Sequence, residues 1–155
     1  MGAQEIKLPD VGNIRNTIKI NFTAAAEVIS LVADKMLQAG SGKIAVISSV
    51  AGDRGRQSNY IYGSAKAGLS AFTSGLRNKL ASTKVHVMTV KPGFVDTPMT
   101  YGMESPLIFP REKAAQGIIK ALSKKKDIVY IPFFWRYIML IIIHIPEKIF
   151  KKLKL

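Results

Sequence analysis

The chain has 155 residues, of which 48% are hydrophobic and 21% charged, and this balance is typical of one globular domain rather than a disordered segment. It contains no cysteine, which excludes disulfides, thiolate metal sites and cysteine nucleophiles and suits a reducing compartment. Lysine and arginine outnumber aspartate and glutamate by 23 to 10, so the formal charge of +13 favours an anionic partner.

Apolar residues of the N-terminal part recur at helical spacing and predict one long helix over residues 14–39, which Gly40 terminates. A short β-rich run over residues 43–49 predicts a buried strand that ends in a loop. Residues 60–81 follow with leucine and phenylalanine on one helical face. They predict a second long helix.

The C-terminal part continues the alternation of strands and helices. Residues 85–90 predict a strand, residues 111–123 a helix and residues 128–131 a third strand. Strands that alternate with long helices indicate parallel βαβ units. We therefore expect an α/β fold with a doubly wound, Rossmann-like parallel sheet in residues 1–131, followed by an apolar and basic helical tail over residues 132–155.

Tyr62 and Lys66 stand four residues apart in a predicted helix and therefore share one face. A nearby ammonium is expected to lower the pKa of a tyrosine toward neutrality, as general acid/base catalysis requires. The pattern is weak by itself, because two solvated helix residues show the same spacing.

Two further polar residues lie beside this pair. Ser49 ends the first strand 13 residues before Tyr62, at the edge of a parallel sheet where ligands bind. Its hydroxyl suits a hydrogen bond to a substrate carbonyl, although a capping serine also fits this place. Asn21 lies among apolar neighbours on the long helix, where a buried amide needs a hydrogen-bond partner.

The segments NFTAAAEV, GKIAVISSVAG, YGSAK and KPGFVDTP resemble, in this order, the short-chain dehydrogenase/reductase family, and the match covers about half of the chain. The resemblance implies that Tyr62 is the general acid/base. Lys66 lowers the pKa of that tyrosine and binds the nicotinamide ribose. Ser49 positions the substrate carbonyl, and Asn21 belongs to the proton relay. Tyr60 lacks a lysine four residues later, so it does not match the motif.

The same resemblance implies a cofactor, NAD or NADP, and interconversion of a carbonyl and an alcohol without a metal. Four residues after the second strand match the family loop that contacts the nicotinamide, namely Pro92, Gly93, Val95 and Thr97. From the residues themselves, a proline-glycine turn allows close backbone approach to a ligand, but such turns also occur without one.

The chain departs from the family in lacking the glycine-rich turn that holds the pyrophosphate and the Asn-Asn-Ala-Gly motif before the long helix. We expect about 80 to 90 residues of family sequence, with the first strands of the sheet, to be absent. The chain is therefore expected to be the C-terminal half of such a domain and poorly active alone. An alternative is a non-catalytic fragment or a membrane-docked interaction subunit.

The tail is apolar and ends in a lysine cluster, and Arg136 and two prolines interrupt its apolar run. We expect it to lie at an anionic membrane interface, with Trp135 and Tyr137 in the headgroup layer, rather than to span the bilayer. The alternative is a helix that packs on its own domain or on a dimer partner. With no secretory signal, the expected location is cytoplasmic, peripheral at the inner face of the membrane.

The tail and the segment AGDRGRQSNYIYGSAKAG are similar to the branch of this family that reduces a keto group on decaprenylphosphoryl sugars. That resemblance implies a lipid-linked substrate, whereas the wider family implies a small-molecule carbonyl or alcohol. Nucleic acid is not expected as a partner, because no nucleic-acid-binding motif accompanies the positive charge. A homo-oligomer is left open.

Overall fold

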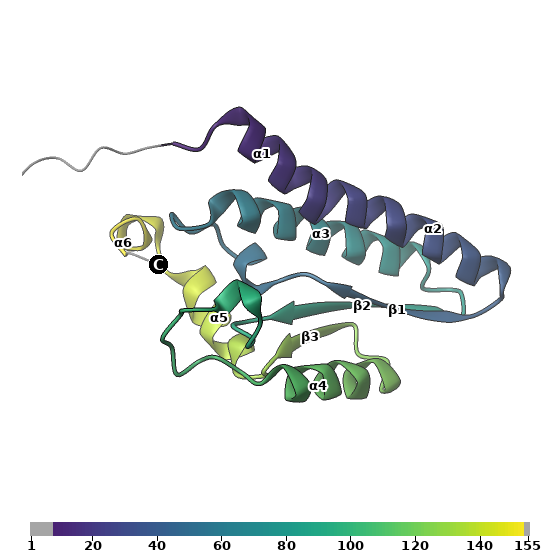
Figure 1. Cartoon of the computed structure of the whole chain (residues 1–155). Coiled ribbons are helices and arrows are strands. Elements are labelled where there is room, and N and C mark those ends of the chain that lie inside the picture. The colour runs from purple at the N-terminus through teal and green to yellow at the C-terminus, as the bar shows by residue number, and fades with distance from the viewer. Residues whose placement is uncertain (1–7, 154–155) are drawn as a thin grey trace, which may run out of the picture.

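Three parallel strands form the centre of the computed structural model, which describes residues 8–153 (Figure 1). The strands are β1 (Gly42–Ile47), β2 (Val85–Pro92) and β3 (Ile128–Ile131), in the spatial order β1-β2-β3. All carboxyl ends therefore meet at one edge of the sheet. The predicted α/β fold with a parallel sheet is confirmed.

One long, nearly continuous helical rod precedes the sheet. It consists of α1 (Val11–Ile18), a π-helical turn (Lys19–Thr23) and α2 (Ala24–Gln38). The rod begins three residues before the predicted start, because the Asp10 carboxylate accepts a hydrogen bond from the Asn13 amide at 2.9 Å and caps the first turn.

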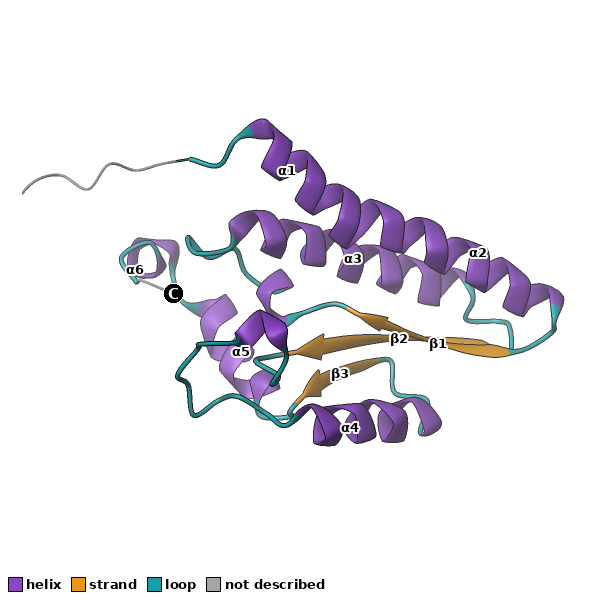
Figure 2. Ribbon diagram, viewed as in Figure 1, coloured by secondary structure: helices purple, strands orange, loops and turns teal. Residues whose placement is uncertain are grey.

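Helices cover both faces of the sheet (Figure 2). The α1–α2 rod and α3 (Tyr60–Lys79) lie on one face, and α4 (Arg111–Ser123) lies on the other. The bounds of α4 and β3 agree with the sequence prediction, whereas β1 stops two residues early and β2 extends two further. This two-sided cover is the doubly wound arrangement, and it explains why β2 is almost entirely buried.

The hydrophobic core has three parts. One lies between the sheet and the α2 and α3 helices and centres on Leu69 and Val87. A second lies between the sheet and α4 and includes Met88 and Val90. The third lies at the carboxyl end of the strands, where the C-terminal tail joins the domain.

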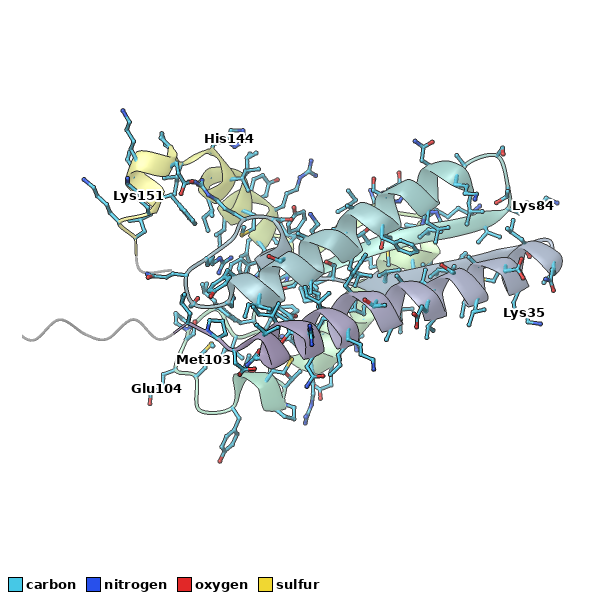
Figure 3. All side chains as sticks on the ribbon, turned by 90° about the horizontal axis from the view of Figure 1, so that it is seen from above. Lys35, Lys84, Met103, Glu104, His144 and Lys151 are labelled. Carbon is cyan, nitrogen blue, oxygen red and sulfur yellow. The ribbon has the colours of Figure 1, made fainter. Side chains whose placement is uncertain are left out.

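The tail forms α5 (Trp135–His144) and α6 (Glu147–Phe150). His144 and Lys151 lie at the end of the molecule opposite Lys35 and Lys84, which places the tail beside the carboxyl ends of the strands (Figure 3). Within residues 8–153, no helix combines the length and apolar character that a membrane span requires.

The two faces of α5 have different surroundings. Trp135 and Met139 are 3% and 1% exposed and share a core with Val50, whereas Phe133, at the entrance to the helix, and Ile141 are 73% and 68% exposed. The inner face of α5 therefore packs on its own domain, as one of the two alternatives for the tail predicted. The expectation that Trp135 sits in a headgroup layer was wrong, because its indole is buried against the turn after β2.

Candidate active site

Ser49 lies directly beyond β1, where the backbone leaves the sheet and enters a short 3₁₀ turn (Val50–Gly52). Its hydroxyl accepts a hydrogen bond from the Ala51 amide at 3.1 Å and so caps this turn. The same side chain lies close enough to Tyr62, on the first turns of α3, to lower the pKa of the Tyr62 hydroxyl. Ser49 thus has the capping role that its position allowed and also contacts the candidate catalytic tyrosine.

Lys66 lies one helical turn after Tyr62, and its Nζ is 5.6 Å from the centroid of the Tyr62 ring. Its ammonium donates a hydrogen bond to the Ile47 carbonyl oxygen at the end of β1, at 3.1 Å. Partial burial lowers the pKa of this lysine. The structure therefore brings Ser49, Tyr62 and Lys66 together at the carboxyl edge of the sheet.

The pKa of Tyr62 is raised, whereas the sequence predicted that it would be lowered. Burial disfavours the phenolate and raises the pKa, while the hydrogen bond from Ser49 acts in the opposite direction and is the weaker effect. The expected lowering by Lys66 was wrong for this arrangement, in which the ammonium is directed to the Ile47 carbonyl. The Tyr62 hydroxyl is accordingly protonated at physiological pH.

Close packing fixes the distance between the Ser49 turn and α3. A Cβ added to Gly63, the residue after Tyr62, would lie 2.8 Å from the Ala51 carbonyl oxygen, and one added to Gly52 would lie 2.7 Å from the backbone of α3. Ser48, which is buried, donates a hydrogen bond to the Lys66 carbonyl oxygen at 2.9 Å. These contacts fix the position of the Ser49 turn relative to the part of α3 that carries Tyr62 and Lys66.

Asn21 occupies the centre of the π-helical turn and is half-buried. Its side-chain amide donates to the Thr17 carbonyl oxygen at 3.1 Å, within its own helix. The neighbouring Phe22 packs against Gly68 of α3, so the turn lies against the helix that carries the tyrosine. Asn21 is near the site but is not joined to Ser49, Tyr62 or Lys66 by a hydrogen bond among the described residues. Single-turn π-bulges are frequent at functional sites.

The loop after β2 carries the four residues expected to contact a cofactor. The Gly93 amide donates to the Ile131 carbonyl at 2.9 Å, Val95 forms a bridge with Phe109, and the Thr97 hydroxyl donates to the Val95 carbonyl at 3.2 Å. Pro92 ends β2 opposite Ile131. This loop is therefore held by its own hydrogen bonds at the carboxyl edge of the sheet.

The indole of Trp135, in the tail, occupies the space beside the Gly93 Cα. A Cβ at this position would lie 1.9 Å from the Trp135 indole nitrogen, so no larger residue fits without moving the indole. Within residues 8–153 the group nearest the Cβ position of Gly93 is Trp135, and the expected contact of the Gly93 backbone with a ligand stays a prediction.

A cavity of about 630 Å³ opens beside the tyrosine, between the start of α1 and the start of α3. Its lining includes Asp10, Asn13, Thr17 and Asn59 as well as Tyr60 and Tyr62. Polar side chains near a neutral tyrosine hydroxyl suit a substrate with a carbonyl or hydroxyl group. A second hollow of about 530 Å³ lies at the opposite, amino end of the strands, and Tyr62 does not line it.

Sequence reasoning missed several residues that shape this site. Ser48 gave no signal because it stands beside the equally plausible Ser49. Asp53 joins Lys91 and Tyr130 in a partly buried network whose members are far apart in the sequence. In the described part of the chain, no group of three or more His, Asp or Glu side chains is placed to hold a metal ion.

Comparison with known proteins places the chain in a family. The short chain dehydrogenase family model matches residues 2–106. An uncharacterized oxidoreductase of Mycobacterium tuberculosis is 35% identical over 154 residues, covering 99% of this chain and 62% of the relative. The acetoacetyl-CoA reductase of Allochromatium vinosum is 43% identical over 86 residues, covering 56% of this chain and 35% of that protein.

A solved short chain dehydrogenase of Burkholderia cenocepacia, in complex with NADP, superposes with a TM-score of 0.78 at 23% identity and covers 87% of this chain and 58% of that one. This likeness confirms the fold. The chain belongs to the short-chain dehydrogenase/reductase family, and it spans about three fifths of the length of the M. tuberculosis relative.

Proposed function

We propose that this chain carries the proton-transfer residues of an NAD(P)-dependent oxidoreductase that interconverts a carbonyl and an alcohol. The observation that supports this most is the grouping of Ser49, Tyr62 and Lys66 at the carboxyl edge of a parallel sheet, with the Lys66 Nζ 5.6 Å from the centroid of the Tyr62 ring. Membership of the family supports the same reaction class.

In the direction of reduction, Tyr62 donates its hydroxyl proton to the substrate carbonyl oxygen while the carbonyl carbon receives a hydride. Ser49 donates a hydrogen bond to the same oxygen and holds it near the phenol. A bound nicotinamide cofactor supplies this hydride. A proton from solvent then restores the phenol of Tyr62.

The residues present fit one end of such a cofactor. Lys66 and Tyr62 offer a donor and a hydroxyl for the hydroxyl groups of a ribose, and the loop that carries Val95 and Thr97 lies at the same edge of the sheet. A glycine-rich turn for the pyrophosphate does not occur in the 155 residues. The 155 residues therefore include groups for the nicotinamide end of the cofactor, and no phosphate-binding turn is identified among them.

Titration of the 155-residue chain with NADPH, followed by ligand fluorescence, is expected to give a Kd of about 1 mM or weaker, since few contacts remain to offset the cost of binding. Lys66→Ala should weaken this binding further. Lys120→Ala, which removes an exposed lysine from α4, is the matched control and should leave it unchanged. A micromolar Kd for the unaltered chain would contradict the proposal that the phosphate contacts are missing.

We also propose that the outer face of α5 and the lysines that follow rest on an anionic membrane surface. The exposed residues of this face are large and apolar, namely Phe133, Tyr137, Leu140 and Ile141. Three exposed lysines follow within a few residues, Lys148, Lys151 and Lys152. Burial of the apolar face and attraction of each lysine, about 1 kcal/mol for each, act together at such a surface.

A substrate carried in the membrane agrees with this position of the tail. A keto group on a polyprenyl-phosphate-linked sugar combines an apolar chain with an anionic headgroup, and both suit the apolar and basic tail. A fold hosts many substrates, so this assignment depends on the tail and on sequence resemblance alone.

A further inference from the structure

The loop between Ser49 and Tyr62 is attached to β3 and the C-terminal tail by four residues in close succession. Asp53, Arg54, Arg56 and Gln57 each contact a residue in the range 130–153. This loop connects the two side chains that form the candidate proton-transfer pair. Its attachment to a segment about 80 to 90 positions later in the sequence is therefore relevant to the geometry of the site.

Arg54 makes the most extensive of these attachments. Its guanidinium donates to the carbonyl oxygens of Ile142 and Ile145, each at 2.6 Å, at the C-terminal end of α5. The same group pairs with the Glu147 carboxylate at 2.9 Å and lies 3.7 Å above the ring centroid of Phe150. The last carbonyls of a helix lack partners within it, so this arginine satisfies them and holds α5 and α6 together.

Asp53 makes the second attachment, toward the sheet. Its carboxylate forms an ion pair with Lys91, the residue before Pro92, and accepts a hydrogen bond from the Tyr130 hydroxyl of β3 at 2.9 Å. The carboxylate side chain is 8% exposed, and a mostly buried charge of this kind is tolerated only when it is paired and hydrogen-bonded. The ion pair thus joins the Ser49 loop to the loop that carries Gly93.

The tail also packs directly on the turn that begins at Ser49. Val50 shares a core with Trp135 and Met139, and the opposite side of the turn is fixed by Gly63 on α3. The serine turn therefore lies between α3, which carries Tyr62, and the tail. Arg54 and Val50 therefore connect the tail to this turn.

We infer that the C-terminal tail is a positioning element of the active site, and that Arg54 is the positioning residue through which α5 and α6 set the place of Ser49 beside Tyr62. This inference builds on the proposed function, in which Tyr62 transfers the proton. The inner face of the tail, held by Arg54, then sets the geometry of the site. The outer face of the tail is free for another contact.

Hydrogen exchange of the full chain, with resonances of ring-labelled tyrosine recorded in parallel, tests this inference. In Arg54→Ala, amides of residues 50–59 should exchange at least about tenfold faster, while amides of β2 keep their protection. The pKa of Tyr62 should rise as the hydrogen bond from Ser49 is lost. Arg111→Ala removes an exposed arginine that pairs only with its neighbour Glu112 and is the control, expected to change neither quantity.

Two results would overturn the inference. In the first, the exchange of residues 50–59 in Arg54→Ala stays at the wild-type rate or rises only in proportion to that of β2. In the second, the loop loosens while the pKa of Tyr62 stays constant, which would make Arg54 a structural residue only. If Arg54→Ala fails to fold, Arg54→Lys and Glu147→Gln serve in its place, with smaller changes of the same sign expected.

This experiment is independent of the proposed function, because neither readout requires turnover. Loss of loop order in Arg54→Ala, together with no turnover by the wild-type chain when it is joined to the unmatched part of the M. tuberculosis relative, would support the positioning role and contradict the proposed reaction. An active enzyme in which Arg54→Ala lowers kcat and leaves the KM for NADPH unchanged would support both.

Discussion

Replacement of Tyr62 by phenylalanine is expected to lower kcat by about 10² to 10⁴-fold, because it removes the proton that the proposed reaction transfers. The ring and its packing stay in place, so the fold and the cavity are retained. The measurement uses the chain joined to the part of the M. tuberculosis relative that lies outside the match, with a panel of small ketones as test substrates and oxidation of NADPH as the signal.

Tyr60→Phe is the matched control for this variant. Tyr60 lies two residues earlier, is 42% exposed and lines the same cavity, but its hydroxyl has no lysine one helical turn later. Its kcat should remain within about twofold of wild type, since the proposed reaction transfers no proton from the Tyr60 hydroxyl. Equal loss in the two variants, or wild-type turnover in Tyr62→Phe, would contradict the assignment.

Replacement of Trp135 by alanine is expected to lower the free energy of unfolding by about 3–5 kcal/mol, the usual cost of removing a large buried aromatic side chain. The indole is 3% exposed and packs edge-on against Phe94 with a centroid separation of 5.5 Å. Phe133→Ala removes an aromatic ring two residues earlier that is 73% exposed, and it should change stability by less than about 0.5 kcal/mol. Urea unfolding of both variants provides the comparison.

The same pair of variants separates the two faces of the tail at a membrane. Co-sedimentation with vesicles that contain phosphatidylglycerol should be strong for the wild-type chain, weaker at high salt and weaker in Phe133→Ala. Vesicles of phosphatidylcholine alone should bind less. If Phe133→Ala binds anionic vesicles as well as wild type does, or if the wild-type chain does not bind them, the proposed membrane contact is refuted.

Much of the fold could be predicted because the local patterns agree with the tertiary structure. The segment over residues 111–123 has clear helical periodicity, and the run over residues 128–131 is bounded by a lysine cluster and a proline, so both elements were located to the residue. The start of the first helix was missed because the capping carboxylate of Asp10 stands before the first apolar residue of the pattern.

The site could be predicted only in part. The spacing of Tyr62 and Lys66 and the position of Ser49 after a strand are local features, and together with the family resemblance they predicted that these three residues lie near one another. The Asp53 network and the Arg54 attachment join residues about 40 to 90 positions apart, and no local pattern identifies such pairs. The uniformly apolar tail gave no contrast between its faces, so Trp135 and Phe133 were indistinguishable before their burial was known.

The pKa of Tyr62 in the unliganded chain tests the central claim most directly, because it reports the contact with Ser49 without cofactor, substrate or turnover. Ring-labelled tyrosine resonances, assigned with Tyr62→Phe, are followed against pH in wild type, in Ser49→Ala and in Ser64→Ala, whose exposed hydroxyl bonds only to the Tyr60 carbonyl. We predict that the pKa of Tyr62 lies above 10 in wild type, rises further in Ser49→Ala and is unchanged in Ser64→Ala. A Tyr62 that titrates at the ordinary tyrosine value and does not respond to Ser49→Ala would contradict the account.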